Sequence, residues 1–304
     1  MDTTTLPFSM QQPVFNEASL DMDDSIGAAI FRMLPQPRPC FTPNLLDEIK
    51  SFQRYIGQIV NQDMATNGYS DWKYVVLASG DSNTFNLGGD LSRFANLIEC
   101  QDRAALMEYA IACIDGAHSF HTHMDLPLTS IALVEGNAQG GGFEAALSCN
   151  VLIAERGTML GFPEVLFNMF PGMGAYSFLS RRIGHGLAER LIYSGDLYTA
   201  ESLYDMGVID VLADQGEGRS ALVSYIRTAR RRTNALKLIQ HVRDAYDRVP
   251  YEELLSITSQ WVDAALNLGS TELGVMKRLV RAQNKRSEKL AKTANQQRVL
   301  KRAT

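Results

Sequence analysis

The sequence predicts an α/β protein whose body alternates strands with helices and whose C-terminal third is helical. Short apolar runs alternate with segments in which apolar residues recur every three or four positions, up to about Glu164. Beyond that residue the helical period dominates. The chain has 304 residues, of which 45% are hydrophobic and 21% charged, which allows one large domain or a main domain with a smaller appendage.

The elements of the first half follow one another in a regular order. An apolar run predicts a strand, an amphipathic segment a helix, and a second apolar run a buried strand; polar turn residues, "LGGDLSRFANLIE" and a long helical segment come next. In chain order the strand, helix, strand and long helix are expected at 26–34, 44–60, 73–79 and 101–123.

The second half begins with the strand "SIALVEG", which leads into three consecutive glycines at 140–142. "NVLIAE" and "TMLGF" predict two further short strands, and after residue 164 only 208–212 is expected as a strand. We therefore expect an N-terminal extension at 1–25, a catalytic core at 26–215 and a helical region at 216–304, serving self-association, a lid on the acyl pocket and a basic tail.

Composition narrows the classes of protein to which the chain can belong. A net charge of −5 does not indicate nucleic acid binding, and no apolar stretch approaches the ~18 residues that span a bilayer. The N-terminus lacks the pattern of a signal peptide. Four scattered cysteines do not make a disulfide framework, so we expect reduced thiols, a cytoplasmic location and no membrane partner.

Charge is unevenly distributed. Residues 276–304 contain ten Lys or Arg and one acid, a net +9, which leaves −14 on the rest of the chain. Such a run is either a solvated helix end or a docking surface for an acidic partner, to which Lys285, Arg286 and Lys289 would contribute.

The triple glycine comes just before Glu144, between a strand and a helix. Such a turn exposes backbone N–H groups at the positive end of a helix, where they bind a phosphate or the oxyanion of a reacting carbonyl. The Walker lysine is missing and the glycine spacing does not fit a dinucleotide fingerprint. An oxyanion hole needs a second donor, and "FNLGGDL" at 85–91 has the same strand, glycine and helix pattern.

Three motifs in order, "FNLGGDL", "EGNAQGGGFEAALSCNVLIAE" and "LGFPEVLFNMFPGMGAYSFLSRRIG", together resemble the enoyl-CoA hydratase/isomerase (crotonase) superfamily. The resemblance runs from about residue 26 to residue 212 and implies a spiral of ββα units followed by a C-terminal helical region. Within the superfamily the motifs are most similar to the diffusible-signal-factor synthases, bacterial enzymes that make cis-2-unsaturated fatty acids used as quorum signals.

The resemblance implies roles for four residues. Gly89 and Gly141 match the two oxyanion-hole positions, and Glu144 and Glu164, 20 residues apart, match the two catalytic glutamates of the hydratases. By the same resemblance Glu164 handles the C2 proton and Glu144 the hydroxyl or water, although the sequence leaves the reverse open.

Several other residues could have either a structural or a functional role. Asp90 is expected to cap a helix. His118, His121 and His123 are expected to face water, so we predict no metal and no cofactor. Residues expected to line an acyl pocket, although they could equally be plain core, are Met173, Trp261, Met276 and Leu279.

Three functions stay open. The resemblance favours a dehydratase with thioesterase activity, which would release a cis-2-enoic acid from a 3-hydroxyacyl group on an acyl carrier protein. The alternative is an enoyl-CoA hydratase/isomerase of fatty-acid degradation, with a CoA-bound substrate. The third is a non-catalytic binding protein, which the retention of both glutamates and both glycines disfavours. The resemblance also implies a homotrimer or other homo-oligomer, and a quorum-sensing sensor protein as a partner.

Overall fold

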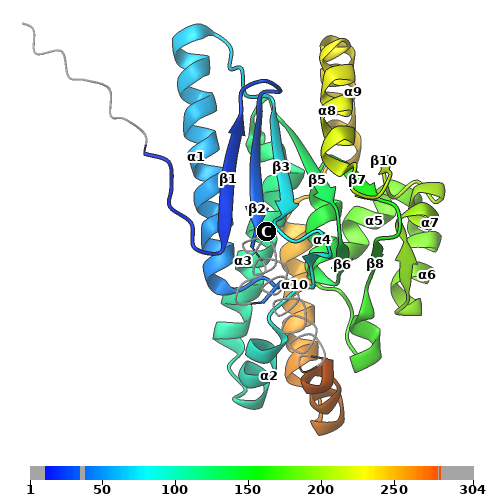
Figure 1. The fold of residues 1–304 in the computed structure, drawn as a ribbon. Coiled ribbons are helices and arrows are strands. Elements are labelled where there is room, and N and C mark those ends of the chain that lie inside the picture. Colours follow the sequence, from blue (N-terminus) through cyan, green and yellow to red (C-terminus); the bar gives the residue numbers. More distant parts are fainter. Residues whose placement is uncertain (1–10, 35–37, 280, 282–304) are drawn as a thin grey trace, which may run out of the picture.

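The computed structural model describes residues 11–34, 38–279 and 281 and contains two sheets (Figure 1). The six-stranded sheet has the order β1-β2-β3-β5-β7-β10; β1 is antiparallel to β2, and the other neighbours are parallel. Its strands are β1 (Ala18–Asp23), β2 (Ala28–Met33), β3 (Tyr74–Ser79), β5 (Thr129–Val134), β7 (Val151–Glu155) and β10 (Val211–Ala213).

The second sheet has four short strands in the order β4-β6-β8-β9. They are β4 (Thr84–Asn86), β6 (Asn137–Gln139), β8 (Met159–Gly161) and β9 (Leu197–Thr199). β4, β6 and β8 are parallel neighbours, whereas β9 runs antiparallel to β8. Along the chain a strand of the large sheet is followed by a strand of the small sheet and then by a helix, three times over. This repeat is the predicted ββα spiral.

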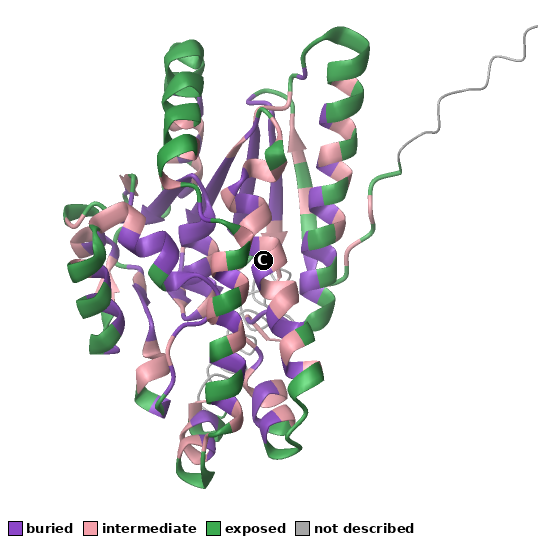
Figure 2. Ribbon diagram, turned by 180° about the vertical axis from the view of Figure 1, so that it is seen from behind, coloured by how far each residue is buried: buried purple, intermediate pink, exposed green. Residues whose placement is uncertain are grey.

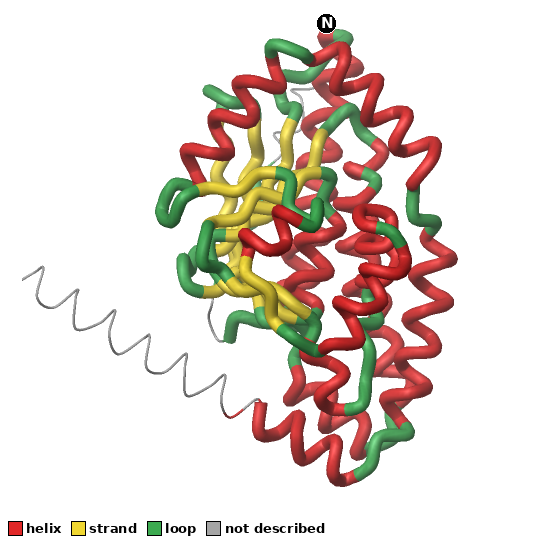
Figure 3. The backbone as a smooth tube through the Cα atoms, turned by 90° about the vertical axis from the view of Figure 1, so that its right-hand side faces the viewer, coloured by secondary structure: helices red, strands yellow, loops and turns green. Residues whose placement is uncertain are grey.

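The helices cover both faces of the large sheet, and in the side view of Figure 3 the strands lie beside a thick layer of helices. The α-helices are α1 (Pro43–Asn67), α2 (Leu91–Glu99), α3 (Arg103–His121), α4 (Gly141–Ser148), α5 (Ala175–Ile183), α6 (His185–Ser194), α7 (Ala200–Asp205), α8 (Gly218–Arg230), α9 (Thr233–Asp247) and α10 (Tyr251–Leu266). Two 3-10 helices are η1 (His123–Asp125) and η2 (Pro163–Phe167), and 270–279 is also helical.

The core follows from the two-residue period of the strands. All six residues of β3 are buried, which explains its continuous apolar run. Phe31 and Leu77 face the cluster that contains α1, α3 and α10, whereas Ile30 and Val76 face the cluster that contains α8. Figure 2 shows these strands as a buried centre between partly exposed helices.

Three expectations need correction. The region expected as an extension contains β1, whose six residues pair with β2; its sequence "ASLDMD" is half polar because it is an edge strand, and so gives no apolar signal. β9 is a three-residue strand in a segment expected to be helical, and β10 starts at Val211 rather than at 208. The first helix of the region expected at 216–304, α8, is not separate from the core but packs directly on the large sheet through Leu222 and Ile226.

The four cysteines are free thiols, in agreement with the expectation from the sequence.

Candidate active site

Three parallel strands of the small sheet bring the predicted site residues together. Parallel strands end at the same edge, so the segments that follow β4, β6 and β8 meet there. These segments supply Gly89, Gly141 with Glu144, and Glu164 respectively. Residues far apart in the sequence thereby share one site.

A cavity of about 110 Å³ opens at this edge. All four of these residues line it, together with Met173, Trp261 and Leu279. Met276 is buried at 1% exposure but is not among the lining residues, because its side chain packs into the main core. The lining is otherwise mostly apolar and comes from α1, α2, α3, β3, η2 and the loops before α1 and after β4: Phe41, Leu46, Ile49, Leu77, Leu87, Leu91, Phe94, Cys113, Ala117, Phe120 and Phe167.

The two predicted oxyanion-hole glycines lie against one another. A Cβ atom on Gly141 would lie 3.5 Å from the backbone nitrogen of Gly89. Gly141 is the first residue of α4, where an N–H group has no partner inside the helix. Within the described chain neither the N–H of Gly89 nor that of Gly141 donates a hydrogen bond to another residue. Two free donors at a cavity wall can therefore bind an anionic oxygen.

Neither of the other two glycines of the triplet could carry a side chain without a steric clash. Gly140 has φ 52°, and a Cβ there would lie 2.3 Å from Oε1 of Glu164. A Cβ on Gly142 would lie 2.1 Å from the carbonyl oxygen of Asn86. The triplet thus lets the loops after β4 and β6 approach each other and admits the carboxyl group of Glu164.

Tyr109 of α3 fixes the first loop. Its hydroxyl donates to the carbonyl oxygen of Phe41 and accepts from the N–H of Asp90, at 3.1 Å. Asp90 caps α2, as predicted, by accepting from Ser92 N and Arg93 N, and it also pairs with Arg38 at 2.8 Å. Gly89 is therefore followed by a residue that is held in place, Asp90.

Glu144 lies in the first turn of α4 and is 2% exposed. Its Oε1 accepts from Met173 N at 2.7 Å and from Ala175 N at 2.9 Å. The hydroxyl of Thr258 on α10 donates to the carbonyl oxygen of Gly172 at 2.9 Å, in the same peptide group as Met173 N. Burial raises the pKa of Glu144 to about 7, although the two N–H bonds oppose the rise.

Glu164 lies in η2, and its Oε2 is buried without a hydrogen-bond partner in the described chain. Burial and the nearby charge of Glu144 raise the pKa of Glu164 to about 8. Because the charge of one carboxylate disfavours ionisation of the other, the pair keeps a proton near neutral pH.

The histidines do not face water as expected. His121 accepts a hydrogen bond from Val249 N at 2.9 Å, and its burial lowers its pKa to about 4. Nε2 of His123 lies 3.0 Å from Asp244. His118 is half-buried and packs edge-on against Tyr251. No group of three or more His, Cys, Asp or Glu side chains in the described part of the chain could bind a metal.

Some site residues were not expected from the sequence. Tyr109, Thr258 and the α1 and α3 residues of the cavity act across long chain separations and belong to no motif. A buried tyrosine hydroxyl needs a partner, but that rule does not say which one. Lys285, Arg286 and Lys289 lie outside the described residues. No helix in the described ranges is long and apolar enough to cross a membrane.

Comparison with known proteins agrees with this architecture. The family model described as "Enoyl-CoA hydratase/isomerase" matches residues 65–264. The short-chain-enoyl-CoA hydratase of Clostridium acetobutylicum is 29% identical over 171 residues, which cover 56% of this chain and 60% of that protein. The chain spans between about a fifth and three fifths of the length of the curated relatives it matches.

Solved structures agree on the fold. Enoyl-CoA hydratase from Bacillus halodurans aligns with a TM-score of 0.69 at 20% identity, covering 88% of this chain and 100% of that one. DspI of Pseudomonas aeruginosa aligns with a TM-score of 0.64 at 22% identity, covering 84% and 91%. At these identities the likeness shows the fold alone, whereas the family model spans most of the chain. The chain belongs to the enoyl-CoA hydratase/isomerase family.

Proposed function

We propose that the protein adds water across the C2–C3 double bond of a 2-enoyl thioester and catalyses the reverse dehydration. The observation that carries this proposal is the shared cavity: two buried carboxyl groups and two free backbone N–H groups line one apolar space. Each part has a task in that chemistry.

The N–H groups of Gly89 and Gly141 would bind the thioester oxygen. Addition or removal of a proton at C2 passes through an enolate, whose negative charge lies on that oxygen. Loss of one such donor typically costs about 3–4 kcal/mol of transition-state stabilisation.

A single proton shared by Glu144 and Glu164 is suited to the addition of water to the double bond. Glu144 accepts two backbone N–H bonds, which stabilise its carboxylate form, so it is the group that accepts the proton of the attacking water. Glu164, whose buried Oε2 has no hydrogen-bond partner in the described chain to stabilise a charge, keeps its proton and delivers it to C2. Dehydration requires the opposite arrangement, with Glu164 ionised and Glu144 protonated.

A second candidate function is synthesis of a cis-2-enoic acid signal from a 3-hydroxyacyl carrier protein. One observation favours it: no Lys or Arg in the described chain lines the cavity, and such a side chain would be the simplest partner for the phosphates of CoA. Dehydration would be followed by attack of a carboxylate-activated water on the thioester carbonyl in the same hole. The thioester bond breaks, and the products are the free acid and the carrier thiol.

Self-association is the third part of the proposal. Leu238, Ile239, Val242 and Tyr246 are exposed along α9, a helix in which no residue is buried. An apolar stripe of this kind indicates a contact between proteins, and a second copy of the chain is the partner we propose.

The experiment is a direct assay with 2-enoyl and 3-hydroxyacyl thioesters, each attached to CoA and to an acyl carrier protein. Loss of the enoyl absorbance with appearance of 3-hydroxyacyl thioester supports the hydratase. Release of free cis-2-enoic acid, identified by mass spectrometry, supports the signal synthase. Absence of both reactions on every substrate contradicts the proposed chemistry.

A further inference from the structure

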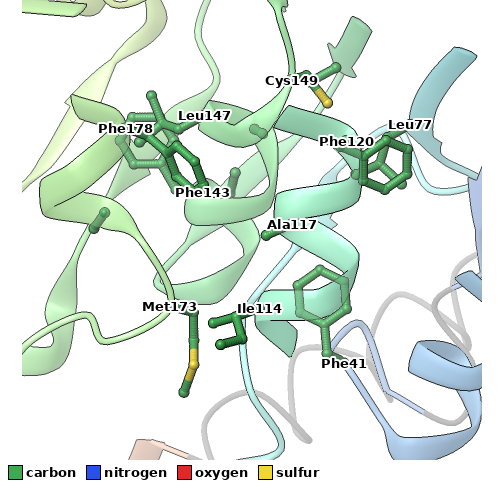
Figure 4. Close-up of a cluster of buried hydrophobic side chains, with 14 of the residues drawn as sticks. Phe41, Leu77, Ile114, Ala117, Phe120, Phe143, Leu147, Cys149, Met173 and Phe178 are labelled. Atoms are coloured by element: carbon green, nitrogen blue, oxygen red, sulfur yellow. The ribbon is translucent and has the colours of Figure 1, made fainter. Parts of the chain in front are cut away.

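The cavity extends from the carboxyl pair into the layer between α1 and α3. Its far part is lined by Leu46 and Ile49 of α1, Gly116 and Phe120 of α3, and Leu77 of β3. Figure 4 shows Phe120 beside Leu77, with Ala117 nearer the middle of the view and Met173 and Phe41 toward the other end. The cavity is therefore lined by residues of α1, α3 and β3 in addition to the predicted site residues.

Gly116 is an unusual residue for its position. It lies inside the 19-residue helix α3, where glycine disfavours the helix by comparison with alanine. A Cβ there would lie 3.5 Å from Cγ2 of Ile49, an ordinary contact distance, so alanine would fit without strain. The missing side chain leaves open the space between α1 and α3 at the far part of the cavity.

We propose that the acyl chain of the substrate lies along α3 and that Gly116 determines the longest chain the protein accepts. This inference rests on the proposed function and adds the substrate class to it. Cys113, Gly116, Ala117 and Phe120 all line the cavity and follow one face of α3. Seven residues of helix span about 10 Å.

The length of α3 that lines the cavity limits the length of the acyl chain that can bind. An extended hydrocarbon advances roughly 1.3 Å per bond, as follows from a C–C length of about 1.5 Å. The lined stretch thus corresponds to a medium-length acyl chain, with roughly eight carbons beyond the thioester. Among the described residues no polar side chain lines this end of the cavity, so it favours an apolar chain terminus over a charged or hydroxylated one.

The test replaces Gly116 by valine and measures kcat/KM for a series of 2-enoyl thioesters from four to fourteen carbons, a range chosen to bracket the roughly eight carbons expected from helix geometry. Substrates too short to reach Gly116 should keep their activity within about twofold. Each methylene that can no longer be buried should cost about fourfold, so the longest accepted substrates should lose roughly tenfold or more.

Gly57 supplies the matched control. It also lies inside a long helix, α1, but it does not line the cavity, and its nearest neighbour to an added Cβ is Leu126 at 3.8 Å. Gly57→Val carries the same change in helix propensity and should leave the chain-length profile of the parent unchanged. If Gly116→Val does not fold, Gly116→Ala decides, with a smaller shift in the same direction.

Binding separates this inference from the proposed reaction. Unreactive acyl thioether analogues of increasing length, titrated by calorimetry, give a chain-length profile without turnover. A profile that shortens in Gly116→Val but not in Gly57→Val supports the inference even if the parent proves inactive as a hydratase. An identical profile in the parent and in Gly116→Val, or no binding of the analogues to the parent, overturns it.

Discussion

Glu144→Gln should make the protein more stable at alkaline pH. The carboxyl group has its ordinary pKa of 4.5 when the chain is unfolded and a pKa of about 7 when it is folded. Between these values ionisation favours the unfolded chain, so the parent loses stability as pH rises from about 4.5 and levels off above about 7. This rise in the pKa of Glu144 corresponds to a loss of about 3 kcal/mol in the free energy of unfolding. Glutamine stays neutral and can still accept from Met173 N and Ala175 N, so it avoids the loss.

The assay is denaturant unfolding of the parent and Glu144→Gln at pH 5 and pH 9. We expect the variant's advantage in free energy of unfolding to be small at pH 5 and to reach about 3 kcal/mol at pH 9. Glu108→Gln, the same change at an exposed position on α3, should show no such growth. A difference between Glu144→Gln and the parent that stays constant with pH would refute the raised pKa and the argument from burial.

Three further results are expected. Gly89→Pro removes one N–H donor and should lower kcat about 10²–10³-fold, measured beside a thermal melt because an added Cβ would also meet the ring of Phe94; full activity in a folded variant removes Gly89 from the hole. Thr258→Val should loosen the Gly172 peptide group, which weakens the N–H bonds to Glu144 and raises the pKa of Glu144. The acidic limb of the kcat/KM profile should therefore move to higher pH, and Thr258→Ser should return it to the parental position. An unmoved limb in the valine variant argues against this positioning role of Thr258. Val242→Glu should reduce the mass found by light scattering, and a parent that is monomeric at micromolar concentration contradicts self-association through α9.

The sequence predicted those elements whose burial is uniform. β3 and β5 are buried strands of a parallel sheet, so their apolar runs are continuous. β1 is an edge strand with two aspartates and β9 has only three residues, so neither gives a periodic signal. Tertiary pairing with β2 and β8 makes them strands.

The site residues also differ in whether the sequence could predict them. The two glutamates and the two glycines proposed for the site lie in motifs beside strand ends, so resemblance to a family could point to them. Tyr109 contacts Phe41, 68 residues away, and Thr258 contacts Gly172, 86 residues away, so no local pattern could predict either contact. Met276 was expected beside Leu279 at the cavity, but only Leu279 lines it, whereas Met276 is buried in the main core.

The central claim is that Glu144 and Glu164 share one proton and exchange it with water and C2. The most direct test is single-turnover hydration of a 2-enoyl thioester by the parent, Glu144→Gln and Glu164→Gln near neutral pH. The account predicts that each variant binds the substrate but forms the 3-hydroxyacyl product about 10²–10⁴-fold more slowly than the parent. Turnover at the parental rate by both folded variants would contradict it.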